Sequence, residues 1–215
     1  MTDVLAGAHP DTGDMVVVHD VFRAVFADAA RLVGGVAPGD TGRSAIVGSY
    51  YGNLLAFLHA HHAGEDELLW PKLLDRCPTE AARIWQIADQ HDAVAAGIER
   101  AEDCLDSWTA VPDAPRRDDL VGVLSALGAE LGTHLADEEH HVLPLAAAHL
   151  SVHEWAQLPA HSIEQFDGDK PWLVLGLVQE AMIAAGRTDG LPAHAVRTWE
   201  AARPQYSAFM AAVRG

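Results

Sequence analysis

The chain has 215 residues, 49% of them hydrophobic, and its 31 acidic against 14 basic side chains give a formal net charge of -17. This size fits one globular domain with a sizeable core, and the charge argues against phosphate backbones or anionic lipid surfaces as partners. No basic run followed by an apolar stretch marks the first residues, and no apolar run approaches the length that spans a bilayer. We therefore expect a soluble cytoplasmic protein that binds neither nucleic acid nor membranes.

The first part of the chain predicts two helices. Apolar residues recur at helical spacing over about 15–33, after Asp14 as a plausible N-cap and before a Gly-Gly stop. A second helix is expected from Ser44, which can cap it, to about residue 76. Pro71 should bend this helix or end it early, because proline lacks a backbone donor and crowds the preceding turn.

Two more long helices are expected in the middle of the chain. Thr79 can cap a third helix over about 80–107, and leucines at helical spacing predict a fourth over about 118–148. Long amphipathic helices with short connections are typical of helical bundles. The sequence therefore predicts an all-α fold, an up-down-up-down antiparallel four-helix bundle.

Shorter helical candidates follow residue 149, around 152–157, 171–185 and 192–213. Proline and glycine predict the breaks between and within them, at Pro159, Gly168, 186–190 and Pro204. We interpret these helices as a C-terminal appendage. The predicted organisation is an N-terminal tail over 1–14, the four-helix bundle over 15–149, and a helical extension packed on the bundle over 150–215.

Histidine is unusually frequent, with 13 residues against 14 Lys and Arg together, and it gathers in two similar segments. His61 and Glu65 form one His-x-x-x-Glu motif, His134 and Glu138 form another, and each is followed six residues later by proline. Residues four apart lie on the same face of a helix, so an imidazole and a carboxylate at this spacing can converge on one metal ion. Two such motifs are much stronger evidence for a metal site than one.

Counting along the predicted helices places two lone histidines at the height of these motifs. His19 lies about 15 residues from the end of its helix and His61 about 16 from the start of the next, so they are level. The same count makes His91 level with His134. The crossing from His61 to His91 is offset by about 6 Å, which an early helix end at Pro71 would reduce. One layer is expected to hold His19, His61, Glu65, His91, His134 and Glu138.

This donor set has a defined metal preference. Imidazole and carboxylate together favour iron, manganese or zinc over calcium or magnesium. Two carboxylates able to bridge suggest two ions. The six side chains do not saturate two octahedral ions, so solvent or a small molecule can take an open position.

With these motifs, the stretch from about 16 to 147 resembles the hemerythrin-like, or HHE cation-binding, domain family. The family pattern is a lone His on the first helix, His-x-x-x-Glu on the second, a lone His on the third and His-x-x-x-Glu on the fourth. Leu69-Trp70-Pro71 after the first motif also matches. The resemblance implies that the six residues of the layer hold two iron ions, joined by an oxo or hydroxo bridge.

Three positions depart from the family's pattern. Oxygen-carrying members have a second His one turn after the third-helix ligand, where this chain has Ala95, which implies one imidazole fewer at one iron. Some relatives have a carboxylate directly after the second-helix His; here His62 stands there and is a further ligand candidate. Glu139 is another, because the carriers use the longer spacing that would let it replace Glu138. A missing fixed ligand favours reactivity over reversible carriage.

We interpret the chain as a non-heme di-iron protein that binds or activates a small oxidant at an open coordination position. Dioxygen, hydrogen peroxide and nitric oxide are the candidates that the resemblance implies. One alternative is a catalase-like enzyme that decomposes peroxide. Another is an oxygen-, redox- or iron-sensing regulatory protein whose C-terminal extension docks a protein partner or a second copy. A ferritin-like oxidase is disfavoured, because that class pairs Glu-x-x-His motifs instead.

Overall fold

The computed structural model describes residues 9–187 and 193–215, and its regular structure is helical throughout them. No strand occurs in these residues, so the predicted all-α class is confirmed. None of the helices described here combines the length and apolar character needed to cross a membrane. The elements are α1 (Gly13–Ala27), α2 (Ala29–Leu32), α3 (Thr41–Gly64), the π-helix η1 (Glu65–Leu69), α4 (Trp70–Arg76), α5 (Ala81–Ala88), α6 (Gln90–Ala110), α7 (Ala114–His141), α8 (Leu143–His149), α9 (Val152–Trp155), α10 (Gln157–Gln165), α11 (Pro171–Ala184) and α12 (Ala193–Arg214).

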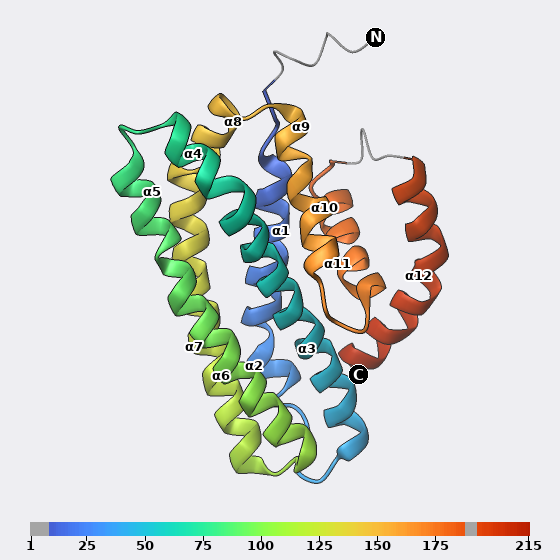
Figure 1. The fold of residues 1–215 in the computed structure, drawn as a ribbon. Helices are drawn as coiled ribbons and strands as arrows, with labels where there is room; N and C mark the ends of the chain where they lie inside the picture. The colour runs from blue at the N-terminus through green and yellow to red at the C-terminus, as the bar shows by residue number, and fades with distance from the viewer. Residues whose placement is uncertain (1–8, 188–192) are drawn as a thin grey trace.

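The longest helices of the first two-thirds of the chain form a bundle. In Figure 1, α1, α3, α6 and α7 lie along the long dimension of the molecule, and α6 packs against both α3 and α7 while α1 packs against α7. Their facing sides bury an apolar core to which each helix contributes, for example Phe22, Leu55, Ile98 and Leu127. Burying such a side chain is worth about 1.5–3 kcal/mol. This core fixes the relative positions of the helices that carry the polar site.

The first two predicted helix starts are wrong by a few residues. α1 begins after Thr12, and Asp14 lies inside its first turn, where a carboxylate interacts favourably with the helix dipole. α3 begins before Ser44, because the side chain of Asp40 accepts the N–H of Arg43 and so caps the helix.

The third and fourth predicted helices also begin elsewhere. Thr79 is not a cap, because the N–H of Glu80 bonds the carbonyl of Cys77 and the chain turns before α5 starts. α7 begins earlier than predicted, because the side chain of Asp113 accepts the N–H of Arg116. Breaks divide three of the four predicted long helices, at Asp28, Asp89 and Val142.

Pro71 neither ends the second helix early nor leaves it a regular α-helix. The chain stays helical through to Arg76 by way of the π-helical turn η1. In η1 the N–H of Trp70 bonds the carbonyl of Glu65, five residues back. The wider turn relieves the conflict between the proline ring and the carbonyl four residues before it. Glu65 is thereby the first residue of a distortion that occurs frequently at functional sites.

The C-terminal helices cover one side of the bundle (Figure 1). α10 packs against α3, α11 packs against α1, and α12 packs against α11. An ion pair of 2.5 Å between Arg76 and Glu154 and a hydrogen bond of 3.1 Å from the Trp155 indole to Asp14 fasten α9 to the same end of the molecule. These contacts join the last third of the chain to the helices that carry the site.

Two of the predicted breaks in this region are wrong. Pro159 lies in the first turn of α10, where a backbone donor is not needed, and Pro204 lies inside α12. The division of the chain at residue 149 stays a prediction. Residues 1–8 of the predicted tail and 188–192 of the predicted extension lie outside the described residues.

Candidate metal centre

Five imidazoles and two carboxylates meet inside the bundle, on residues that are at most 6% exposed. They form two groups, and within each group one potential ligand atom per residue lies within 4.8 Å of the others. One group is His62, Glu65, His91 and His134, and the other is His19, His61, Glu65 and Glu138. The structure therefore brings together all six residues of the predicted layer and adds His62.

Each bundle helix contributes to the cluster, and helical spacing explains how. His61 and Glu65 are one turn apart across the end of α3, and His134 and Glu138 are one turn apart on α7. His61 and His62 are neighbours and diverge: His61 faces His19 on α1, with ring centroids 5.3 Å apart, whereas His62 faces α6 and α7. One helix thus supplies imidazoles to both groups.

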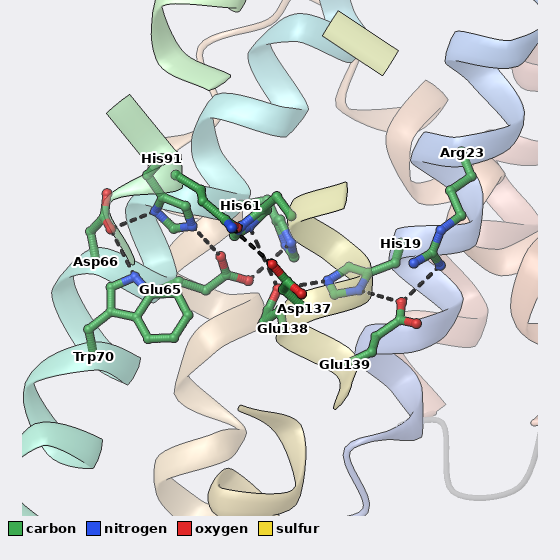
Figure 2. Close-up of polar contacts among 12 residues, drawn as sticks. His19, Arg23, His61, Glu65, Asp66, Trp70, His91, Asp137, Glu138 and Glu139 are labelled. Carbon is green, nitrogen blue, oxygen red and sulfur yellow. Dashed lines mark hydrogen bonds and ion pairs between the residues drawn. The ribbon is translucent and has the colours of Figure 1, made fainter. Parts of the chain in front are cut away.

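The carboxylate of Glu65 lies between the two groups. Its Oε1 is 3.0 Å from Nε2 of His61, and its Oε2 is 3.4 Å from Nε2 of His91. These contacts also remove the height offset that we expected between the two imidazoles. Figure 2 shows the Glu65 side chain between the rings of these two histidines.

The carboxylate of Glu138 takes the corresponding position on the other side. Its Oε2 is 3.4 Å from Nε2 of His19 and 3.9 Å from Nε2 of His134, which belong to different groups. Each carboxylate therefore faces one imidazole of each group.

The inward-facing atoms of the cluster have no hydrogen-bond partner. Nine buried atoms are in this state, namely Nε2 of all five histidines and both oxygens of Glu65 and Glu138. Leaving a buried polar group unsatisfied costs about 1–3 kcal/mol, so nine such groups would cost about 9–27 kcal/mol. That is comparable to or larger than the roughly 5–15 kcal/mol of a typical domain's net stability. Cations bound by these lone pairs would remove that cost. The donor set therefore fits metal ions.

The outward-facing nitrogens, in contrast, have partners. Nδ1 of His19 is 2.8 Å from Glu139, Nδ1 of His91 is 2.7 Å from Asp66, and Nδ1 of His134 is 3.1 Å from Oε1 of Gln90. In a neutral imidazole such a contact fixes the ring orientation and the tautomer, and it leaves Nε2 with its lone pair directed inward. This is the usual arrangement around metal-binding histidines.

Burial keeps most of the imidazoles neutral. It lowers the pKa of His61 and of His134 to about 4, and it lowers the pKa of His62 well below the ordinary value. Burial also acts to lower the pKa of His91, but Asp66 and Glu65 outweigh it and raise that pKa to about 9. In the metal-free chain at neutral pH, His61, His62 and His134 are therefore neutral and keep a free lone pair. His91 is protonated on both ring nitrogens and carries a positive charge.

The two carboxylates are perturbed in opposite directions. Burial acts to raise the pKa of Glu65, but the surrounding imidazoles, His61 first, hold it well below its ordinary value. Burial raises the pKa of Glu138 well above its ordinary value, and the charges of Glu65 and Glu139 add to this. One negative charge in the cluster thus faces the positive charge of His91, which limits the charge buried when no cation is bound.

The positions that depart from the family pattern are resolved differently from our expectation. Ala95 is exposed, so a side chain there would not reach the cluster. His62 instead brings the fifth imidazole, stacked on His91. Glu139 is not part of either group; it lies behind His19, paired with its Nδ1 and with Arg23. The expected shortage of imidazole is therefore not seen in this cluster.

Two outer residues were missed from the sequence. Gln90 contacts His134 and donates from Nε2 to Asp137 at 3.0 Å, and Arg23 pairs with Glu139 at 2.8 Å. The position of Gln90 directly before a predicted ligand gave no helical-spacing signal. Arg23 lies one turn after His19, which is a spacing that could have suggested it.

The hemerythrin HHE cation binding domain family matches residues 11–146, more than half of the chain. No curated protein and no solved structure matches the chain. The matched stretch contains every member of the two ligand groups, and their buried, unpartnered nitrogen and oxygen atoms fit the binding of cations. The chain belongs to the hemerythrin HHE cation-binding domain family.

Proposed function

We propose that the chain is a non-heme di-iron protein that binds or activates a small oxidant, dioxygen, hydrogen peroxide or nitric oxide, inside an up-down-up-down bundle. The observation that carries the proposal is the set of nine buried, unpartnered donor atoms divided into two groups that share Glu65. Two groups support two ions. The alternation in direction of α1, α3, α6 and α7 in Figure 1 supports the bundle topology.

Glu65 and Glu138 are the residues that we propose to bridge the ions. Each directs oxygen toward one imidazole of either group, at 3.0–3.9 Å. His62, His91 and His134 would complete one position, and His19 and His61 the other. The position with two imidazoles has fewer protein ligands, so it is the one at which we place the open coordination site.

The donor chemistry limits the metal to a small set, and family membership favours iron within it. Nitrogen and carboxylate ligands in one site suit iron, manganese or zinc. Two bound irons would supply reversible electron transfer and a coordination position for the oxidant. The chain's own residues enclose both positions: Phe22 packs on His61 beside the open position, and Trp70 packs on His91 beside the other, with ring centroids 5.3 and 5.4 Å apart. This enclosure favours diatomic molecules or peroxide over larger substrates.

Metal analysis of the iron-loaded chain tests the proposal. We expect about two irons per chain and ligand-to-metal charge-transfer absorption in the oxidised state. Because Glu65 belongs to both groups, Glu65→Ala should lose most of both irons. Glu67→Ala is the matched control, since its side chain is 59% exposed two residues away. A wild-type chain that keeps no iron, or that binds only zinc without a redox response, would contradict the proposal.

A sensory role is the second candidate, and one contact favours it. α10 of the C-terminal extension packs on Gly64, directly before Glu65, where a Cβ would lie 3.2 Å from Oγ of Ser162. A change at the metal ligands can therefore reach the extension. Hydrogen exchange of α10 in the reduced and oxidised iron forms distinguishes the roles: a change in protection supports sensing, and unchanged protection opposes it.

A further inference from the structure

One oxygen of Glu139 is shared between a metal-site histidine and an arginine. Nδ1 of His19 and Nη1 of Arg23 each lie 2.8 Å from Oε1 of Glu139. His19 and Arg23 are one turn apart on α1, and Glu139 comes from α7, as Figure 2 shows. The chain of contacts runs from the fully buried His19 to Arg23, whose side chain is 32% exposed.

This arrangement is not repeated behind the other two histidines with outward partners. Asp66, behind His91, accepts a neutral N–H from the Trp70 indole at 3.0 Å. Gln90, behind His134, is itself neutral. Glu139, Asp66 and Gln90 are the outer partners of the three histidines. Among the described residues that contact these partners, Arg23 is the one with a permanently positive side chain.

We propose that Arg23 is a positioning residue that makes the position holding His19 and His61 the weaker of the two metal positions. The proposal rests on the proposed function. A carboxylate on Nδ1 raises the basicity of the imidazole and so strengthens its bond to a metal. Arg23 binds the same carboxylate oxygen and draws its negative charge away from His19. Its own charge also opposes cations nearby. Asp66 shares its oxygen only with the neutral N–H of Trp70, so His91 keeps more of this effect than His19 does.

Cobalt(II) titration of the full-length metal-free chain tests this, because cobalt absorption reports each filling step without oxidation. Arg23→Gln should tighten one of the two steps roughly three- to tenfold, by removing the opposing charge. Glu139→Gln should weaken the same step by roughly ten- to a hundredfold, by removing the partner of His19. Arg23→Lys keeps the charge and should stay near the wild-type affinity. Arg23→Met, which keeps an aliphatic stem, is the second neutral variant.

The opposite changes in affinity expected for Arg23→Gln and Glu139→Gln distinguish an electrostatic effect of Arg23 from a purely structural one. If Arg23 only held Glu139 in place, Arg23→Gln and Arg23→Met would weaken binding as Glu139→Gln does, and the proposal would be overturned. Affinities equal to wild type in both neutral variants would also overturn it. A wild-type chain that binds no cobalt would instead refute the proposed function itself. Circular dichroism of each metal-free variant checks that the helices remain.

Discussion

The ring of His62 stacks on that of His91, with centroids 4.2 Å apart and planes inclined by 22°. This contact joins α3 to α6 at the height of the cluster. His62 also meets His134 edge-on at 5.1 Å, so it completes a group of three imidazoles on three different helices. The residue that follows the motif histidine is therefore as central to the candidate site as the motif itself.

We expect His62→Ala to lower the iron content from about two to about one per chain, because His62 belongs to only one ligand group. The control is His59→Ala, since His59 lies on the same helix with an exposed side chain. Iron analysis and the charge-transfer spectrum measure the result. Full iron content in His62→Ala would mean that the stacked ring is not a ligand.

Metal affinity should rise with pH up to about the pKa of His91. In the metal-free chain that pKa is about 9, because Asp66 and Glu65 outweigh the lowering effect of burial. Binding needs the lone pair of Nε2, so His91 must release a proton below this pH and not above it. Each proton released makes the affinity increase about tenfold per pH unit. Glu138, whose pKa burial raises, adds to the release.

Calorimetry in buffers of different ionisation enthalpy counts these protons. At least one should be released per chain at neutral pH. Asp66→Asn removes the carboxylate that does most to raise the pKa of His91, so the metal affinity of this variant should depend less steeply on pH. A wild-type affinity that stays constant between neutral pH and pH 9 would refute the assignment.

The sequence predicted the all-α class and the six residues of the layer because both depend on helical spacing, which is a local property. The assembly of the site depends on details that spacing does not contain. We expect Pro71 to bend its helix or end it early. The helix does not end there: a π-helical turn carries it on and leaves Glu65 between the two groups. The direction of the His62 ring is likewise decided by packing against α6 and α7.

The outer residues show a second limit of the sequence. Ala95 reads as a lost ligand because it lies one turn after His91, but it is on the exposed side of α6. Gln90 reaches His134 across a helix interface, between residues 44 positions apart in the chain. No periodic pattern records such a contact. The donor types of the cluster could be predicted from the sequence, whereas the contact between Gln90 and His134 could not.

Substituting Gly64 should disturb both the fold and the metal site. A Cβ there would lie 3.2 Å from Oγ of Ser162, so the larger side chain of Gly64→Val forces α10 away from α3. Such overpacking costs about 1–3 kcal/mol. Because Glu65 follows directly, we also expect weaker metal binding. Thermal unfolding and cobalt titration measure the two effects.

Gly132→Ala is the control for this substitution. A Cβ at Gly132 meets nothing within 4 Å, so the change should only relieve the helix penalty of glycine and stabilise α7 by about 0.5–1 kcal/mol. If Gly64→Val behaves in the same way, α10 does not constrain the turn that carries Glu65. The sensory candidate would then lose its structural support.

Removing the metals should lower the thermal stability sharply, because nine buried ligand atoms then lose the bound ions at once. A ligand present at a thousandfold excess over its dissociation constant stabilises the folded state by about 4 kcal/mol. For a chain of this size, that corresponds to a shift in Tm of roughly 8–16 °C. Calorimetric scans before and after chelation measure the shift. Gly132→Ala should raise both transitions equally, since a Cβ at that position would meet nothing within 4 Å, whereas His62→Ala should narrow the gap between them. If the loaded and chelated chains unfold at the same temperature, the cluster is not a metal site that the fold depends on.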